Sequence, residues 1–178
     1  YSGAVGLSAL GANTTASYIT AIGNDSLKAN TTGAQNTALG SGTLETNTTG
    51  GGNVAIGNAA LYTNNASNSV AVGKSALEAN TTAAGSTAVG AFAADANTTG
   101  SEIVAVGISS LSANTTGIRN VAVGKESLMA NTTAQDNTAL GASALQDNVS
   151  GSYNTAVGNY SLTNNTDAIV HNILPGET

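Results

Sequence analysis

Disulfide bonds, basic surfaces and long apolar segments are all missing from this 178-residue sequence. It contains no cysteine, so disulfide bonds contribute nothing to its stability. Four residues are Lys or Arg against ten Asp or Glu, and the four form no basic stripe that would bind nucleic-acid phosphates. No apolar run approaches the roughly 18 residues of a membrane-spanning helix. We therefore expect no nucleic-acid partner and no membrane insertion by this segment.

Residues that carry catalysis or bind metals are equally scarce. The only histidine is His171, near the C-terminus, and the serines occur without a positioned base. Pairs of possible oxygen ligands such as Asn24-Asp25 and Asp136-Asn137 lack the regular acidic loop of a calcium-binding repeat. We therefore expect a protein that is not an enzyme and that carries no cofactor and no metal.

What the sequence does contain is a repeat marked by glycine. Glycine recurs at one constant interval, except that the step from Gly57 to Gly73 is a single residue shorter, and a fixed short period of this kind is typical of a solenoid. We predict an all-β parallel β-solenoid of ten coils over residues 1–166, followed by an irregular tail, linker or cap at 167–178. The recurring residues form the glycine column: Gly6, Gly23, Gly40, Gly57, Gly73, Gly90, Gly107, Gly124, Gly141 and Gly158.

Two apolar columns precede this glycine, and together they predict a short strand. An alanine stands two residues before it in every unit, and a branched aliphatic residue stands one before it. The run Thr/Val-Ala-Val is rich in β-branched residues and too short for a helix. The alanine column is Ala4, Ala21, Ala38, Ala55, Ala71, Ala88, Ala105, Ala122, Ala139 and Ala156, and the aliphatic column is Val5, Ile22, Leu39, Ile56, Val72, Val89, Val106, Val123, Leu140 and Val157.

A leucine column follows the glycine by four residues and predicts a second short strand, with the glycine supplying a sharp bend between the two. In one unit Ala94 replaces the leucine, and Phe92 stands two residues earlier. Residues two apart share a face of a strand, so Phe92 is expected to fill the same part of the core. The leucine column is Leu10, Leu27, Leu44, Leu61, Leu77, Leu111, Leu128, Leu145 and Leu162.

Asparagine stands seven residues after every column glycine, usually before Thr-Thr, and predicts the main turn. The shorter unit loses its residue in this turn, near Asn65-Ala66-Ser67, where a deletion leaves strand register intact. Stacked amides can bond coil to coil. Alternatively, surface asparagines of Asn-x-Thr/Ser sequences can accept glycans, and the candidate acceptors are Asn13, Asn30, Asn47, Asn65, Asn80, Asn97, Asn114, Asn131 and Asn148.

Both faces of the predicted strand are apolar, which is typical of a strand buried on both sides. One face can line the core of the coil and the other can meet a partner chain, with alanine allowing close approach. We therefore expect an oligomer, most simply a trimer with alanine at its axis; the alternative is a narrow monomeric solenoid with alanine inside. The candidate core and interface residues are Ala55, Ala71, Ala88, Ala105, Ala122, Val72, Val89, Val106, Val123, Leu77, Phe92, Leu111 and Leu128.

The units Asn53-Val54-Ala55-Ile56-Gly57, Ser69-Val70-Ala71-Val72-Gly73 and Asn120-Val121-Ala122-Val123-Gly124 resemble the head repeats of trimeric autotransporter adhesins. The longer unit, which adds Ala-Leu and Asn-Thr-Thr-Gly, is similar to repeats of phage tail-fibre proteins. The resemblance covers about residues 2–166. It implies a left-handed, trimeric β-roll on a virion or cell surface.

On these grounds we expect a structural rod of an extracellular or virion fibre that supports adhesion, with a host-surface glycan or protein as receptor. Two alternatives stay open. One is a glycan-coated filament of an extracellular matrix built from the same solenoid. The other is an ice-binding solenoid that uses the columns formed by the repeated Thr-Thr pairs.

Overall fold

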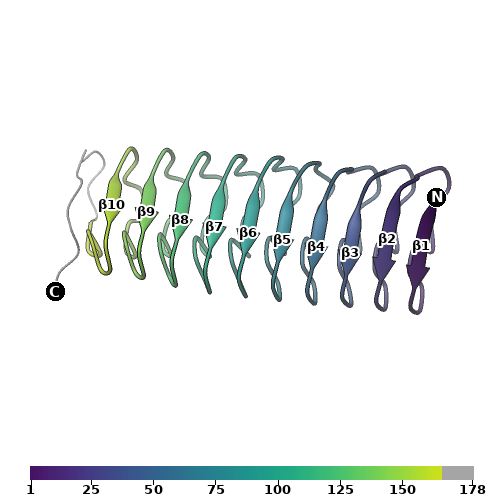
Figure 1. The fold of residues 1–178 in the computed structure, drawn as a ribbon. Helices are drawn as coiled ribbons and strands as arrows, with labels where there is room; N and C mark the ends of the chain where they lie inside the picture. The colour runs from purple at the N-terminus through teal and green to yellow at the C-terminus, as the bar shows by residue number, and fades with distance from the viewer. Residues whose placement is uncertain (166–178) are drawn as a thin grey trace.

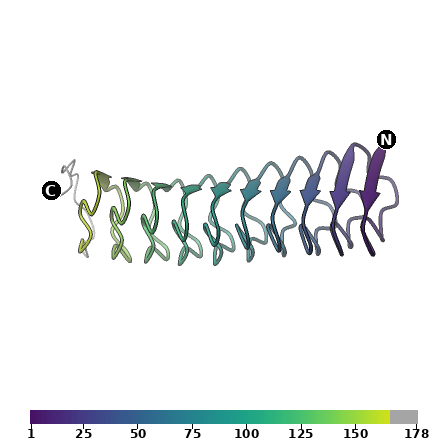
Figure 2. The same ribbon diagram turned by 60° about the horizontal axis from the view of Figure 1, so that its bottom comes forward.

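The computed structural model describes residues 1–165, and these residues form an all-β, parallel β-solenoid, as predicted. Within them, ten strands lie side by side in one parallel sheet, in chain order (Figure 1). The first and last strands lie at opposite ends of an elongated rod in both views (Figure 2). The strands are β1 (Ser2–Val5), β2 (Ile19–Ile22), β3 (Thr37–Leu39), β4 (Val54–Ile56), β5 (Val70–Val72), β6 (Thr87–Val89), β7 (Val104–Val106), β8 (Val121–Val123), β9 (Thr138–Leu140) and β10 (Thr155–Val157).

The predicted tail at 167–178, with His171, lies outside the described residues. The described part holds no group of three or more His, Cys, Asp or Glu that could bind a metal ion. It also holds no helix long and apolar enough to cross a membrane.

Strand register is constant along the rod, because the sequence repeats in step with the coils. Alanine pairs with alanine in successive strands, including Ala55 with Ala71 across the shorter unit. The prediction that the deletion spares the strands is therefore confirmed.

Each strand ends at a column glycine whose backbone only glycine adopts easily. The φ angle is +122° at Gly57 and +136° at Gly73. A Cβ atom built on Gly57 would lie 2.6 Å from the carbonyl oxygen of Gly73 in the next coil. The predicted sharp bend is confirmed, and the close stacking of successive glycines explains why a side chain is absent there.

The predicted second strand is wrong: the chain after the glycine is a series of tight turns. In the second coil, Asp25 and Leu27 have φ angles of +55° and +49°, outside the range of a strand. Local hydrogen bonds close the turns, from Lys28 N to Asp25 O (3.3 Å) and from Asn30 N to Leu27 O (3.2 Å). We call this segment, residues 24–30 in the second coil and its equivalents, the turn wall, and the strands the sheet wall.

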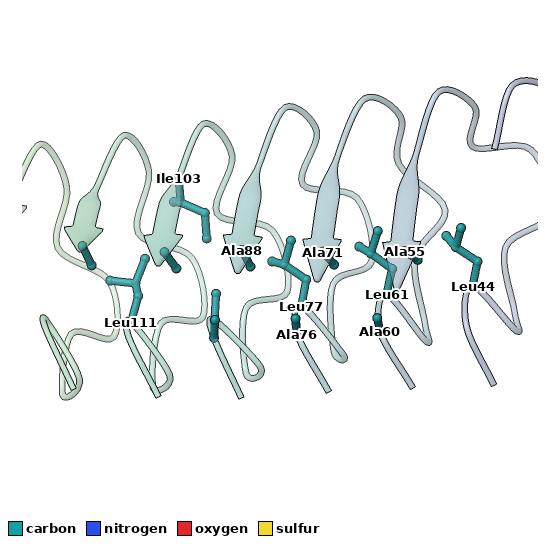
Figure 3. Packing of buried hydrophobic residues seen from close by; sticks show 14 of the residues in the cluster. Leu44, Ala55, Ala60, Leu61, Ala71, Ala76, Leu77, Ala88, Ile103 and Leu111 are labelled. Carbon is teal, nitrogen blue, oxygen red and sulfur yellow. The ribbon is translucent and has the colours of Figure 1, made fainter. Parts of the chain in front are cut away.

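The core lies between the two walls and is lined by the alanine and leucine columns (Figure 3). Ala55, Ala88, Leu77 and Leu111 are fully buried, and the same holds for each alanine of the column from Ala21 to Ala156. The prediction that alanine faces a partner chain is therefore wrong. Alanine points inward because the two walls approach too closely for a larger residue opposite leucine.

Phe92 does not fill the core as predicted. Its side chain is 38% exposed, whereas Ala94 is fully buried at the position that leucine occupies in other coils. The two residues would share a face of a strand, but they lie in a turn in which Phe92 and Ala94 both have positive φ.

Candidate self-association surface

The outer face of the sheet is an uncharged stripe that runs the length of the rod. It consists of the aliphatic column and of the threonine or valine two residues before each of its members. We call it the outer stripe, and from β2 to β10 its residues are Thr20, Ile22, Thr37, Leu39, Val54, Ile56, Val70, Val72, Thr87, Val89, Val104, Val106, Val121, Val123, Thr138, Leu140, Thr155 and Val157.

The outer stripe is exposed because strand residues alternate between faces and alanine takes the inner one. Burial alternates accordingly, as in β7, where Ala105 is buried and both flanking valines are half-buried. Larger fractions are exposed elsewhere, with 47% of Leu140 and 37% of Val89 accessible. A strand that is apolar on both faces is normally covered on both.

The stripe is most apolar in its middle section. In β4, β5, β7 and β8 both outward residues are aliphatic, whereas threonine takes one of the two places in β2, β3, β6, β9 and β10. Four of the five strands from β4 to β8 therefore present only aliphatic residues, and an apolar centre with a more polar rim is the usual composition of a protein interface.

The structure separates the predicted core and interface residues into two groups. Val72, Val89, Val106 and Val123 lie together on the outer stripe. The others, except Phe92, lie inside the coil: Ala55, Ala71, Ala88, Ala105, Ala122, Leu77, Leu111 and Leu128.

The asparagine column forms an amide ladder inside the coil. The Nδ2 of Asn47 donates to Asn30 Oδ1 (2.9 Å), and that of Asn114 donates to Asn97 Oδ1 (2.7 Å). Each amide also closes its own turn, as in the bond from Asn47 Nδ2 to Gly50 O (2.9 Å). The predicted coil-to-coil bonding of stacked amides is confirmed for these pairs, and it satisfies turn carbonyls away from water.

Most candidate glycan acceptors are therefore not surface residues. A glycan is attached through Nδ2, which here is enclosed and already hydrogen-bonded, so the premise of an exposed turn is wrong for these positions. Asn13 is half-buried and Asn65 is exposed. The fully buried acceptors are Asn30, Asn47, Asn80, Asn97, Asn114, Asn131 and Asn148.

A second row of buried polar residues was not predicted from the sequence. Asn36 sits one residue before β3, and its Nδ2 donates to Gly50 O (2.8 Å), while its Oδ1 accepts from Asn53 N (2.9 Å). The same type of bond recurs further along the rod, where Asn137 N donates to Asn120 Oδ1 (3.0 Å). Their spacing of two from the alanine column could have revealed them, because residues two apart in a strand share a face.

Asn65 replaces a backbone group that the short coil lacks. In a full coil, Thr14 N and Thr14 Oγ1 both donate to the carbonyl oxygen of Thr31 in the next coil (3.2 and 3.0 Å). At the short coil, the side-chain Oδ1 of Asn65 accepts instead, from Thr48 N (3.1 Å) and Thr49 N (2.9 Å). The side-chain amide keeps the turn closed despite the missing residue.

The Thr-Thr pairs that follow the asparagine column form two threonine columns along the rod. Both columns reach the surface. The first threonine of each pair donates its hydroxyl to the next coil, as Thr98 does to Thr115 O (2.9 Å). The second is exposed, as at Thr99 and Thr116. These residues lie in a bend rather than a strand, so alternation between two faces does not apply to them.

Charged side chains lie off the outer stripe, and three of the four cations pair with acidic residues. Arg119 forms a two-pronged ion pair with Asp136 (2.7 and 2.8 Å), which lowers the pKa of Asp136 and raises that of Arg119. Asp95, on the turn wall, differs. Burial, followed by the charge of Glu78 in the preceding coil, raises the pKa of Asp95, although backbone hydrogen bonds oppose the shift.

Comparison with family models, with curated proteins and with solved structures finds no match to this chain. What the residues show by themselves is a parallel β-solenoid of tandem coils, repeated at a nearly constant interval, with an uncovered, uncharged stripe along its sheet.

Proposed function

We propose that this chain is a non-enzymatic structural rod of an extracellular or virion fibre. The observation that carries the proposal is the outer stripe, which continues in register from coil to coil. Rod length follows from the number of coils at about 4.8 Å each. Stiffness follows from hydrogen bonds between successive coils in both walls, such as Thr37 N to Asn53 O (2.8 Å) and Leu27 N to Thr43 O (2.9 Å).

The partner that fits the outer stripe is a second copy of the same chain. A stripe with a repeat of about 4.8 Å is matched along its whole length only by a surface with the same repeat. We propose three chains around one axis, with the aliphatic column rather than the alanine column facing that axis. Three-fold closure would cover the stripe of every chain.

Handedness and location rest on the resemblance to adhesin heads and tail fibres. From it we propose a left-handed coil, placed on a virion or cell surface. The rod would support or display binding to a host-surface glycan or protein receptor, and it needs no cofactor for this role.

The native mass measured by sedimentation equilibrium tests the proposal. We expect particles of three times the 17.2 kDa chain mass. The double variant Val106→Asp/Val123→Asp places two charges on the outer stripe and should abolish these particles. Thr99→Asp/Thr116→Asp adds the same charge to the threonine columns and should leave them intact. A wild-type chain that sediments as a single chain at every concentration would contradict the proposal.

A second candidate, ice binding, is favoured by the threonine columns. Both columns are accessible, and the backbone bonds of the first column fix its hydroxyls in one repeated orientation. Asn65 and Val149 interrupt the array. Thermal hysteresis that is lost in Thr99→Asp/Thr116→Asp would support this function over the rod.

A further inference from the structure

The coil that contains Gly90 differs from its neighbours in the position of its large apolar side chain. Its leucine-column position is Ala94, fully buried, and its exposed turn position is Phe92. That turn position follows the column glycine by two residues and is otherwise small or polar, apart from Tyr160. Its other members are Ser8, Asp25, Gly42, Ala59, Ser75, Ser109, Glu126 and Ser143. A large apolar side chain has thus moved from the core to the surface in this coil.

This exchange lowers the stability of a single chain. Replacing a buried leucine by alanine typically removes several kcal/mol of stability, and an exposed phenylalanine recovers little of it. Covering the Phe92 ring would offset part of this loss, beside the apolar volume that the fully buried Ile103 adds to the core of the adjacent coil.

Phe92 lies just beyond the C-terminal end of strand β6, next to the outer stripe. Phe92 N donates to Lys74 O of the preceding coil (2.9 Å), and Lys74 Nζ lies 5.3 Å from the ring centroid. On the other side, Ser109 N donates to Ala91 O (3.0 Å), which brings the next turn alongside. These bonds fix the backbone at Phe92 and beside it, and the Lys74 ammonium lies over the ring.

Two exposed apolar residues lie in the segments next to Phe92. Ile108, in that next turn, is 55% exposed, and Val89, at the end of β6, is 37% exposed. Lys74 forms no ion pair with any residue of the described chain, unlike the other three cations. We call Lys74, Val89, Phe92 and Ile108 the Phe92 patch. Through Val89 this patch overlaps the outer stripe near the middle of the ten coils.

We propose that Phe92 is the anchor of self-association, with its ring packed on the outer stripe of a second copy of this chain. This inference rests on the proposed function and deepens it by naming the side chain on which assembly most depends. Energetic anchors of interfaces are typically aromatic and central, and Phe92 is an aromatic residue in the sixth of the ten coils. A second copy is the occupant because it offers an uncharged apolar stripe with the same coil spacing.

The test separates assembly from folding. Phe92→Ser gives this coil the residue found at the same position in other coils, and we expect the chain concentration needed for half-assembly to rise about tenfold or more. Phe92→Ser/Ala94→Leu restores the usual core residue and should assemble as poorly as Phe92→Ser, while unfolding at a higher temperature than Phe92→Ser. Tyr160→Ser, at the equivalent position of the last described coil, is the matched control and should assemble like the wild type.

The outcomes distinguish this inference from the proposed function. A wild-type chain that never assembles overturns both. A wild-type trimer whose assembly is unchanged by both Phe92 variants overturns the anchor and leaves the rod standing. A double variant that regains wild-type assembly also overturns the anchor, because the effect of Phe92→Ser would then lie in folding.

Discussion

From the second to the ninth coil, the sheet wall and the turn wall bury one apolar column apiece, but they do so with different backbones. The sheet wall is a three- or four-residue strand whose inner residue is alanine. The turn wall holds leucine in a left-handed conformation, with φ between +49° and +53° from Leu10 to Leu162. Left-handed backbone costs roughly 1–2 kcal/mol for a residue other than glycine. The turn wall is therefore maintained by stacking and burial, whereas the sheet wall agrees with local preference.

The bend between the two walls is the most sensitive point. A Cβ on Gly124 would lie 2.8 Å from the amide nitrogen of Ala142 and closer still to the carbonyl group of Gly141. Gly124→Ala should lower the free energy of unfolding by more than about 3 kcal/mol or prevent folding. Denaturant unfolding measures this change. Gly85 also has a positive φ, but a Cβ there meets nothing within 4 Å, so Gly85→Ala should cost only about 1 kcal/mol.

Truncating the turn wall inside the core should have the next largest effect. Leu128→Ala leaves a cavity opposite the alanine column, and we expect a loss of about 2–5 kcal/mol in the free energy of unfolding. Met129→Ala changes the neighbouring, half-buried side chain and should cost under about 1 kcal/mol. Equal losses would mean that the leucine column is not the main support of the turn wall.

Removing the side chain that bridges the short coil should have a moderate effect. Asn65→Ala leaves the amides of Thr48 and Thr49 without their acceptor, at an expected cost of about 1–3 kcal/mol. Thermal unfolding measures the loss. Asn159→Ala is a suitable control, because Asn159 is exposed and makes no side-chain hydrogen bond within residues 1–165. No difference between the variants would show that water replaces the Asn65 oxygen.

The smallest predicted effect concerns the charge on the turn wall. Because the pKa of Asp95 is raised in the folded chain, the folded state holds this proton more tightly than the unfolded state does. Its contribution to stability should therefore fall as pH rises from about 3.8 through the folded pKa. Asp95→Asn should raise stability at neutral pH by less than about 1 kcal/mol, after solvent screening. Asp136→Asn should act in the opposite direction, because the pKa of Asp136 is lowered.

The sheet wall could be predicted from the sequence because its signals are local. A regularly recurring glycine, with a β-branched run before it, predicted the solenoid, the strand and the position of the deletion. The direction in which the strand faces could not be predicted, because both of its columns are apolar and alternation alone does not distinguish inside from outside. The structure shows which face is inside, because the alanine column lies opposite the leucine column across the core.

The turn wall could not be predicted for a different reason, and the asparagine ladder was one of two interpretations that the sequence left open. Leucine carries no local preference for left-handed backbone, so Leu27 and its equivalents suggest a strand. Asn-Thr-Thr suggests an exposed turn, yet the asparagine turns inward to bond the carbonyl groups of its own coil and the amide of the preceding one. Both features depend on stacking between coils, which a single unit does not reveal.

Thiol labelling of the cysteine-free chain tests the central claim, that the outer stripe is covered by other copies. Val89→Cys places a thiol on the outer stripe, where 37% of the valine is accessible in a single chain, and Thr116→Cys places one on the exposed threonine column. We predict that in native particles Val89→Cys reacts slowly and Thr116→Cys reacts fast, and that dilution to single chains removes the difference. Fast labelling at Val89→Cys in the concentrated native protein would contradict the account.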